Sequence, residues 1–163
     1  MNRNNGFNDR LNFIIVEDNI NKIAKIKDIL TEIEVEPLIV TGGKYRERTV
    51  QAAIEIHGDG KLPVIFLDEY FGTEELDSGS LIYSELSHYL KGKGGLLFPI
   101  SPFPKLQLEK WSQAFIQGER DWYIEEELNP ILENFNSTQI ARVCNEFLSM
   151  VDSKEQGGEI KNG

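Results

Sequence analysis

Short apolar runs alternate along this chain with longer stretches in which apolar residues recur at helical spacing. The runs are brief and rich in β-branched and aromatic residues, which favours buried strands over helices. The longer stretches place apolar residues three or four positions apart, as in Ile23, Ile26 and Leu30, which predicts amphipathic helices. The pattern predicts strands at residues 12–16, 37–40, 63–68, 96–101 and 122–124, with helices between them, including one at 104–118, and a last helix at 140–151.

Five strands that alternate with helices predict the α/β class. We expect a doubly wound, five-stranded parallel sheet with helices on both faces, in one domain at residues 11–151. Residues 1–10 and 152–163 are polar and rich in Asn or Gly, so we expect disordered tails there. In such a sheet, ligands bind at the carboxyl ends of the strands, where the strand order reverses.

The composition narrows the classes of partner and compartment. The formal net charge is −10 and Lys and Arg do not cluster, which argues against a nucleic-acid partner. No apolar run is long enough for a membrane span, and the first residues lack the apolar stretch of a signal peptide. The single cysteine, Cys144, cannot form a disulfide within the chain, which fits a reducing compartment. We therefore expect a cytoplasmic protein with no membrane or nucleic-acid partner.

Carboxylates follow two of the predicted strands directly. Glu17 and Asp18 end the first strand, and Asp68 ends the third. Three carboxylates in one cleft would repel one another unless a hard divalent cation such as Mg²⁺ lies between them. One of them could then act as a nucleophile toward a phosphoryl group, with the metal neutralising the developing charge. The alternative is structural, because Asp18 or Asn19 could simply cap the helix that follows.

Five segments, taken in order, resemble the receiver domain of two-component response regulators, which has a flavodoxin-like fold. The resemblance covers residues 11–151, nearly all of the chain that we expect to be ordered. Each motif is weak alone, but their order and spacing together are more specific. The segments are residues 14–19, like the acidic opening; 64–68, like the phosphoacceptor strand; 78–81, like the entry to the third helix; 97–101, like the fourth strand; and 115–124, like the glycine, spacer and fifth strand.

The resemblance implies a role for each matching residue. It makes Glu17 and Asp18 ligands of Mg²⁺, and Asp68 both a ligand and the phosphoacceptor. Tyr70 would give a backbone carbonyl to the metal, and Ser101 would be the hydroxyl that contacts the phosphoryl group.

Three departures from the receiver pattern affect this interpretation. Glu125 stands where the family has a lysine at the end of the fifth strand, and a glutamate there would repel a phosphoryl group. Lys105, in the loop after Ser101, is a candidate substitute for that cation. The loop after Asp68 is long and acidic, and Pro102 restrains the backbone of Ser101.

The leading functional hypothesis is a stand-alone receiver of a phosphorelay, a signalling phosphoprotein and not an enzyme. It would take phosphate from a histidine kinase or phosphotransfer protein onto Asp68 and signal through phosphorylation-dependent binding of a downstream protein. The alternative is a pseudo-receiver, a phosphate-independent interaction module, which the missing lysine favours. A third class is a Mg²⁺-dependent phosphatase or other hydrolase, with Glu69 or Glu125 as its acid-base. The hypotheses leave homodimer formation open.

Overall fold

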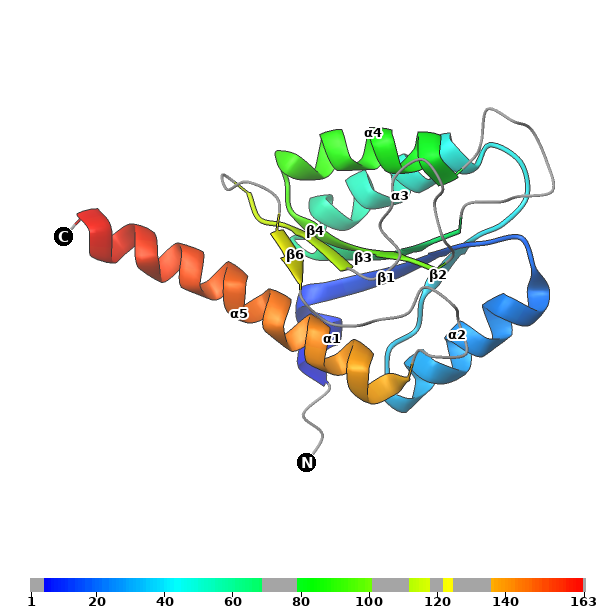
Figure 1. The fold of residues 1–163 in the computed structure, drawn as a ribbon, viewed down its shortest axis with the longest axis horizontal. Helices are drawn as coiled ribbons and strands as arrows, with labels where there is room; N and C mark the ends of the chain where they lie inside the picture. The colour runs from blue at the N-terminus through cyan, green and yellow to red at the C-terminus, as the bar shows by residue number, and fades with distance from the viewer. Residues whose placement is uncertain (1–4, 69–78, 101–111, 118–121, 125–135, 163) are drawn as a thin grey trace.

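The structure, a computed structural model, describes residues 5–68, 79–100, 112–117, 122–124 and 136–162. Within these ranges the chain forms a six-stranded sheet with helices packed on both of its faces (Figure 1). The strands are β1 (Leu11–Val16), β2 (Leu38–Val40), β3 (Leu62–Leu67), β4 (Gly95–Pro99), β5 (Ser112–Phe115) and β6 (Trp122–Ile124). The helices are α1 (Asn5–Arg10), α2 (Ile20–Glu32), α3 (Tyr45–Gly58), α4 (Gly79–Lys91) and α5 (Ser137–Asn162).

The sheet confirms the predicted α/β class. Its strand order is β2-β1-β3-β4-β5-β6, and the first four strands in this order are parallel. The chain moves from β1 to β2 on one side and then returns to β3 on the other side of β1. The order therefore reverses between β1 and β3, as in flavodoxin-like folds, and this is where such sheets bind ligands.

The end of the sheet differs from the prediction of five parallel strands. β5 runs antiparallel to β4, and β6 runs antiparallel to β5. Residues 112–115, which we expected within a helix, form β5 because their side chains alternate between two buried faces. Gln113 and Phe115 lie toward α4, whereas Ala114 lies in the cluster on the opposite face. The predicted strand at residues 122–124 exists as β6, but it is a sixth strand beyond β5.

Two apolar clusters hold the helices against the sheet. Side chains of β1 alternate between them, so that Phe13 and Ile15 join one cluster while Ile14 and Val16 join the other. Helices α2 and α5 cover the first face, and α3 and α4 cover the second (Figure 1). The apolar stripe predicted for the last helix is buried in the first cluster, namely Ile140, Val143, Cys144, Phe147 and Leu148.

Both chain ends contain helical structure where we expected disordered tails. Phe7 in α1 is buried in the apolar cluster that α5 covers, which explains why residues 5–10 pack against the fold as a helix. Helix α5 continues past the predicted end at Val151 as far as Asn162. The guanidinium of Arg10 pairs with the carboxylate of Asp152 through hydrogen bonds of 2.8 and 3.2 Å, and this pair joins the two ends of the fold.

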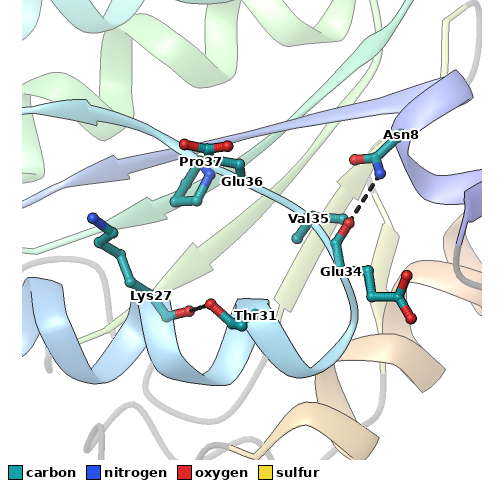
Figure 2. Close-up of a pocket in the computed structure, with 7 residues that line it drawn as sticks. All are labelled: Asn8, Lys27, Thr31, Glu34, Val35, Glu36 and Pro37. Atoms are coloured by element: carbon teal, nitrogen blue, oxygen red, sulfur yellow. Dashed lines mark hydrogen bonds between the residues drawn. The ribbon is translucent and has the colours of Figure 1, made fainter.

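A surface cavity of about 520 Å³ lies at the amino ends of β1 and β2, opposite the carboxyl edge (Figure 2). Asn8 donates a hydrogen bond of 2.9 Å to the carbonyl oxygen of Glu34, and the Thr31 hydroxyl donates to the carbonyl oxygen of Lys27. The charged residues that line it, including Glu36, are exposed. The cavity therefore lacks a buried charge and is separate from the acidic edge of the sheet.

Candidate metal centre

The register of the parallel strands brings the predicted acidic residues together. Val16 of β1 pairs with Leu67 of β3, so the next residue in each strand, Glu17 and Asp68, end neighbouring strands at the point where the strand order reverses. The backbone ladder extends one residue further. The Glu17 amide donates to the Val40 carbonyl, and the Asp68 amide donates to the Val16 carbonyl, each at 3.3 Å. The backbone positions of both residues are therefore fixed by sheet geometry.

Three carboxylates meet at this position. One carboxylate oxygen from each of Glu17, Asp18 and Asp68 lies within 4.8 Å of the other two. Glu17 is 0% exposed and Asp68 is 2% exposed, whereas Asp18 is more accessible. This buried acidic cluster could bind a metal ion, as the sequence predicted.

The two oxygens of Glu17 have different surroundings. Oε2 accepts hydrogen bonds of 3.0 Å from the backbone amides of Asp18 and Asn19. Oε1 is buried and has no hydrogen-bond partner among the described residues. A buried carboxylate oxygen without a donor is costly, because it has lost its hydration without compensation. A cation bound at the cluster would supply that compensation.

The electrostatics of Glu17 also favour a cation. Burial raises the pKa of Glu17 to about 8, the hydrogen bond from the Asn19 amide opposes this rise, and the nearby charge of Asp68 adds to it. The charge of Lys22 acts in the opposite direction and lowers the pKa of Glu17. The fold therefore disfavours ionised Glu17 beside Asp68 unless positive charge is close. Oxygen ligands with this charge suit a hard divalent cation such as Mg²⁺.

At the start of α2, the residue that caps the helix is not one of the three acidic residues. Asn19 is the N-cap, and its Oδ1 accepts hydrogen bonds from the amides of Asn21 at 2.9 Å and Lys22 at 3.2 Å. Asn19 therefore fills the capping role that the structural alternative gave to Asp18 or Asn19, and that role does not account for the buried carboxylates of Glu17 and Asp68.

Sequence reasoning missed one residue at this site. Lys22 Nζ lies 3.9 Å from Asp68 Oδ1, and the Lys22 side chain is 40% exposed while that of Asp68 is 3% exposed. The signal that could have identified it is a lysine in the first turn of a helix, where the helix dipole disfavours positive charge.

Four predicted site residues lie outside the described residues. They are Tyr70, Ser101, Lys105 and Glu125, and the alternative acid-base Glu69 is a fifth. The structure does describe the residues that directly precede two of them, Ile100 before Ser101 and Ile124 before Glu125. The Ile100 amide donates a 3.0 Å hydrogen bond to the Leu67 carbonyl, so the residue before Ser101 lies just past the end of β4, beside the end of β3.

The position of β6 is relevant to the lysine that receiver domains have at the end of their fifth strand. Ile124, which precedes Glu125, pairs with Ser112 of β5. Since Gln113 pairs with Leu97, Ile124 lies at the carboxyl edge of β4, the same edge as the acidic cluster. However, β4 and β5 separate β6 from β3. At about 4.8 Å per strand, β6 is roughly 14 Å from β3, whereas a fifth strand beside β4 would be roughly 10 Å away.

No protein-family model matches this chain, and neither a curated protein nor a solved structure matches it. The resemblance to receiver domains therefore depends on the motifs and on the order of the first four strands. Within the described ranges, no helix combines the length and the apolarity needed to span a bilayer.

Proposed function

We propose that this chain is a receiver-like signalling domain that binds Mg²⁺ and accepts a phosphoryl group on Asp68. The observation that carries the proposal is the carboxylate cluster at the reversal of strand order, in which the buried Glu17 Oε1 has no described hydrogen-bond donor. Lys22 offsets part of the repulsion between the carboxylates, but in a purely structural cluster the buried Glu17 Oε1 would still lack a donor.

The three carboxylates of the cluster would have different chemical roles. Glu17 and Asp18 would hold Mg²⁺ together with one oxygen of Asp68, and the metal would supply charge neutralisation for the phosphoryl oxygens. The other oxygen of Asp68 is the nucleophile of the proposal. A carboxylate that attacks phosphorus needs no general base, which fits a cluster without a described histidine.

The expected partners follow from this chemistry. The phosphodonor would be a histidine kinase or a phosphotransfer protein, and the domain would signal by changing its affinity for a downstream protein. In this role the protein is a cytoplasmic phosphoprotein and not an enzyme with its own small-molecule substrate. Ser101, which follows the described end of β4, is the expected hydroxyl contact of the phosphoryl group.

A pseudo-receiver is the second candidate, and the placement of β5 favours it. Because β5 lies antiparallel between β4 and β6, the end of β6 is one strand further from Asp68 than in a five-stranded parallel sheet. Glu125 follows this strand in place of a lysine. A domain of this kind could keep the fold and bind its partner without phosphorylation.

A crystal structure soaked with Mg²⁺ and beryllofluoride, a phosphoryl mimic, tests the proposal. We expect Mg²⁺ between Glu17, Asp18 and Asp68, and beryllium bonded to an oxygen of Asp68. The matched control is Asp68→Asn, which keeps the shape of the side chain and should hold no beryllofluoride. Mg²⁺ without beryllofluoride in the wild type, or an empty cluster, would contradict phosphoacceptance on Asp68 and favour the pseudo-receiver.

A further inference from the structure

Lys22 brings a positive charge to the acidic cluster from α2. Its Nζ lies 3.9 Å from Oδ1 of Asp68, and its charge also acts on Glu17. Helix α2 and the end of β6 lie at different places along the carboxyl edge. The cation therefore approaches Asp68 from a different element than the strand where the receiver resemblance places a lysine.

The local structure holds Lys22 at this position. Its backbone amide donates to the Oδ1 of Asn19, so the N-cap fixes the start of its side chain. The adjacent Ile23 is buried in the core, which fixes the rotation of α2 about its axis. The side chain of Lys22 is 40% exposed, so it keeps the freedom to move between Asp68 and a group attached to it.

Lys22 occupies a position where a positive charge destabilises a helix. It is the third residue of α2, whose first turn contains no acidic residue. The partial positive charge at a helix N-terminus disfavours a lysine there and favours an anion nearby. Departures from local preference concentrate at functional sites. The pairing with a nearly fully buried carboxylate is a compensation that the described structure supplies.

The balance of charges at the acidic cluster favours a role for Lys22 in phosphorylation. Glu17, Asp18 and a phosphorylated Asp68, which carries roughly two negative charges, together exceed the charge of one divalent cation. A second fixed cation would therefore stabilise the phosphorylated state and the transition state that leads to it. A carboxylate has two oxygens, so Asp68 can contact a metal ion and an ammonium group at the same time.

We propose that Lys22 is the cation that contacts the phosphoryl group on Asp68, in place of a lysine on the last strand. This inference rests on the proposed function. An oxygen of Asp68 attacks the phosphorus of a donor such as acetyl phosphate, the bond between phosphorus and the donor oxygen breaks, and acetate leaves with the electron pair. The Lys22 ammonium stays protonated throughout and contacts the phosphoryl oxygens as negative charge moves onto them.

The test compares the rate of acetyl-phosphate labelling in Lys22→Ala, Lys22→Arg and Lys25→Ala, measured by intact-protein mass spectrometry with Mg²⁺ present. Lys25 is an exposed lysine on the same helix, so its variant controls for the loss of one positive charge. We expect Lys22→Ala to label about ten-fold more slowly or worse, Lys22→Arg to recover part of the rate, and Lys25→Ala to match the wild type. Calorimetry should show that Lys22→Ala binds Mg²⁺ at least as tightly as the wild type, since a competing cation has been removed.

The labelling rates distinguish a failure of the role of Lys22 from a failure of the proposed function. If the wild type labels on Asp68 and Lys22→Ala labels at the same rate, the role of Lys22 is contradicted while the proposed function stands. If the wild type does not label at all, the proposed function fails and this inference fails with it. Slower labelling with weaker Mg²⁺ binding in Lys22→Ala would also contradict the inference, because Lys22 would then act on the metal site and not on the phosphoryl group.

Discussion

Glu17 and Asp68 stand one residue beyond the paired residues Val16 and Leu67, at the ends of two neighbouring parallel strands. This relationship places two buried carboxylates side by side at the reversal of strand order. Burial and the charge of Asp68 both raise the pKa of Glu17, so the charged form of Glu17 is disfavoured at this position. Positive charge from a bound Mg²⁺ and from Lys22 would stabilise the charged form of Glu17 beside Asp68.

We predict that Asp18→Ala lowers the affinity for Mg²⁺ by at least about ten-fold, because it removes one of three oxygen ligands. The measurement is a calorimetric titration at fixed pH and ionic strength. Asp28→Ala is the matched control, since Asp28 is an exposed acid on α2 and its loss changes the net charge equally. Equal Mg²⁺ affinity in the Asp18 variant and the wild type would remove the proposed metal site.

We predict that Tyr83→Phe destabilises the fold by about 1–3 kcal/mol. The Tyr83 hydroxyl donates to Oε1 of Gln113, which is 3% exposed, and this bond ties α4 to β5. The variant removes a donor from a buried amide, whereas Tyr83→Phe combined with Gln113→Leu removes both polar groups and should recover much of the loss. Urea unfolding of the wild type, the single variant and the double variant measures these differences in the free energy of unfolding. A negligible loss in the single variant would contradict the contribution of this hydrogen bond between α4 and β5 to the stability of the fold.

His57 makes part of the stability depend on pH. Its Nε2 lies 2.8 Å from the carbonyl oxygen of Gly94, to which it donates, and its Nδ1 accepts from the Tyr89 hydroxyl at 2.9 Å. This arrangement suits the neutral ring. Burial lowers the pKa of His57 in the folded protein, and the nearby charge of Lys93 also lowers it. The folded state therefore binds the extra proton less readily than the unfolded state does.

The sign of the pH effect follows from that difference. The contribution of neutral His57 to stability is complete above the ordinary histidine pKa of about 6.5 and declines as the pH falls below it, toward the lower pKa of the folded state. We predict that the stability advantage of the wild type over His57→Gln shrinks between about pH 7.5 and pH 5 in urea unfolding. His88→Gln, at an exposed position on α4, is the control and should follow the wild type. A difference between wild type and His57→Gln that does not change with pH would contradict this role.

Much of the fold could be predicted because β1, β3 and β4 are short, apolar and buried on both faces. The parallel arrangement then placed Glu17 and Asp68 together, since strand ends are set by the register of the sheet and not by side-chain detail. Helix α2 followed in the same way from its apolar spacing and from Asn19 as its cap.

The last part of the sheet could not be predicted from local patterns. The apolar residues at 108, 111 and 115 fit a helical spacing, but pairing with β4 decides the conformation of residues 112–115. Arg10 and Asp152 pair across almost the whole sequence, so nothing near either residue indicates the contact. Lys22 stands in the first turn of a helix, where a lysine is unfavourable, but its approach to Asp68 depends on how α2 packs against the sheet.

The most direct test of the central claim is to incubate the protein with acetyl phosphate and Mg²⁺ and to locate the added phosphoryl group by peptide mass spectrometry. The account predicts one labelled peptide, modified on Asp68, with labelling lost in Asp68→Asn and when a chelator removes Mg²⁺. Unlabelled wild-type protein, or equal labelling in Asp68→Asn, would contradict it.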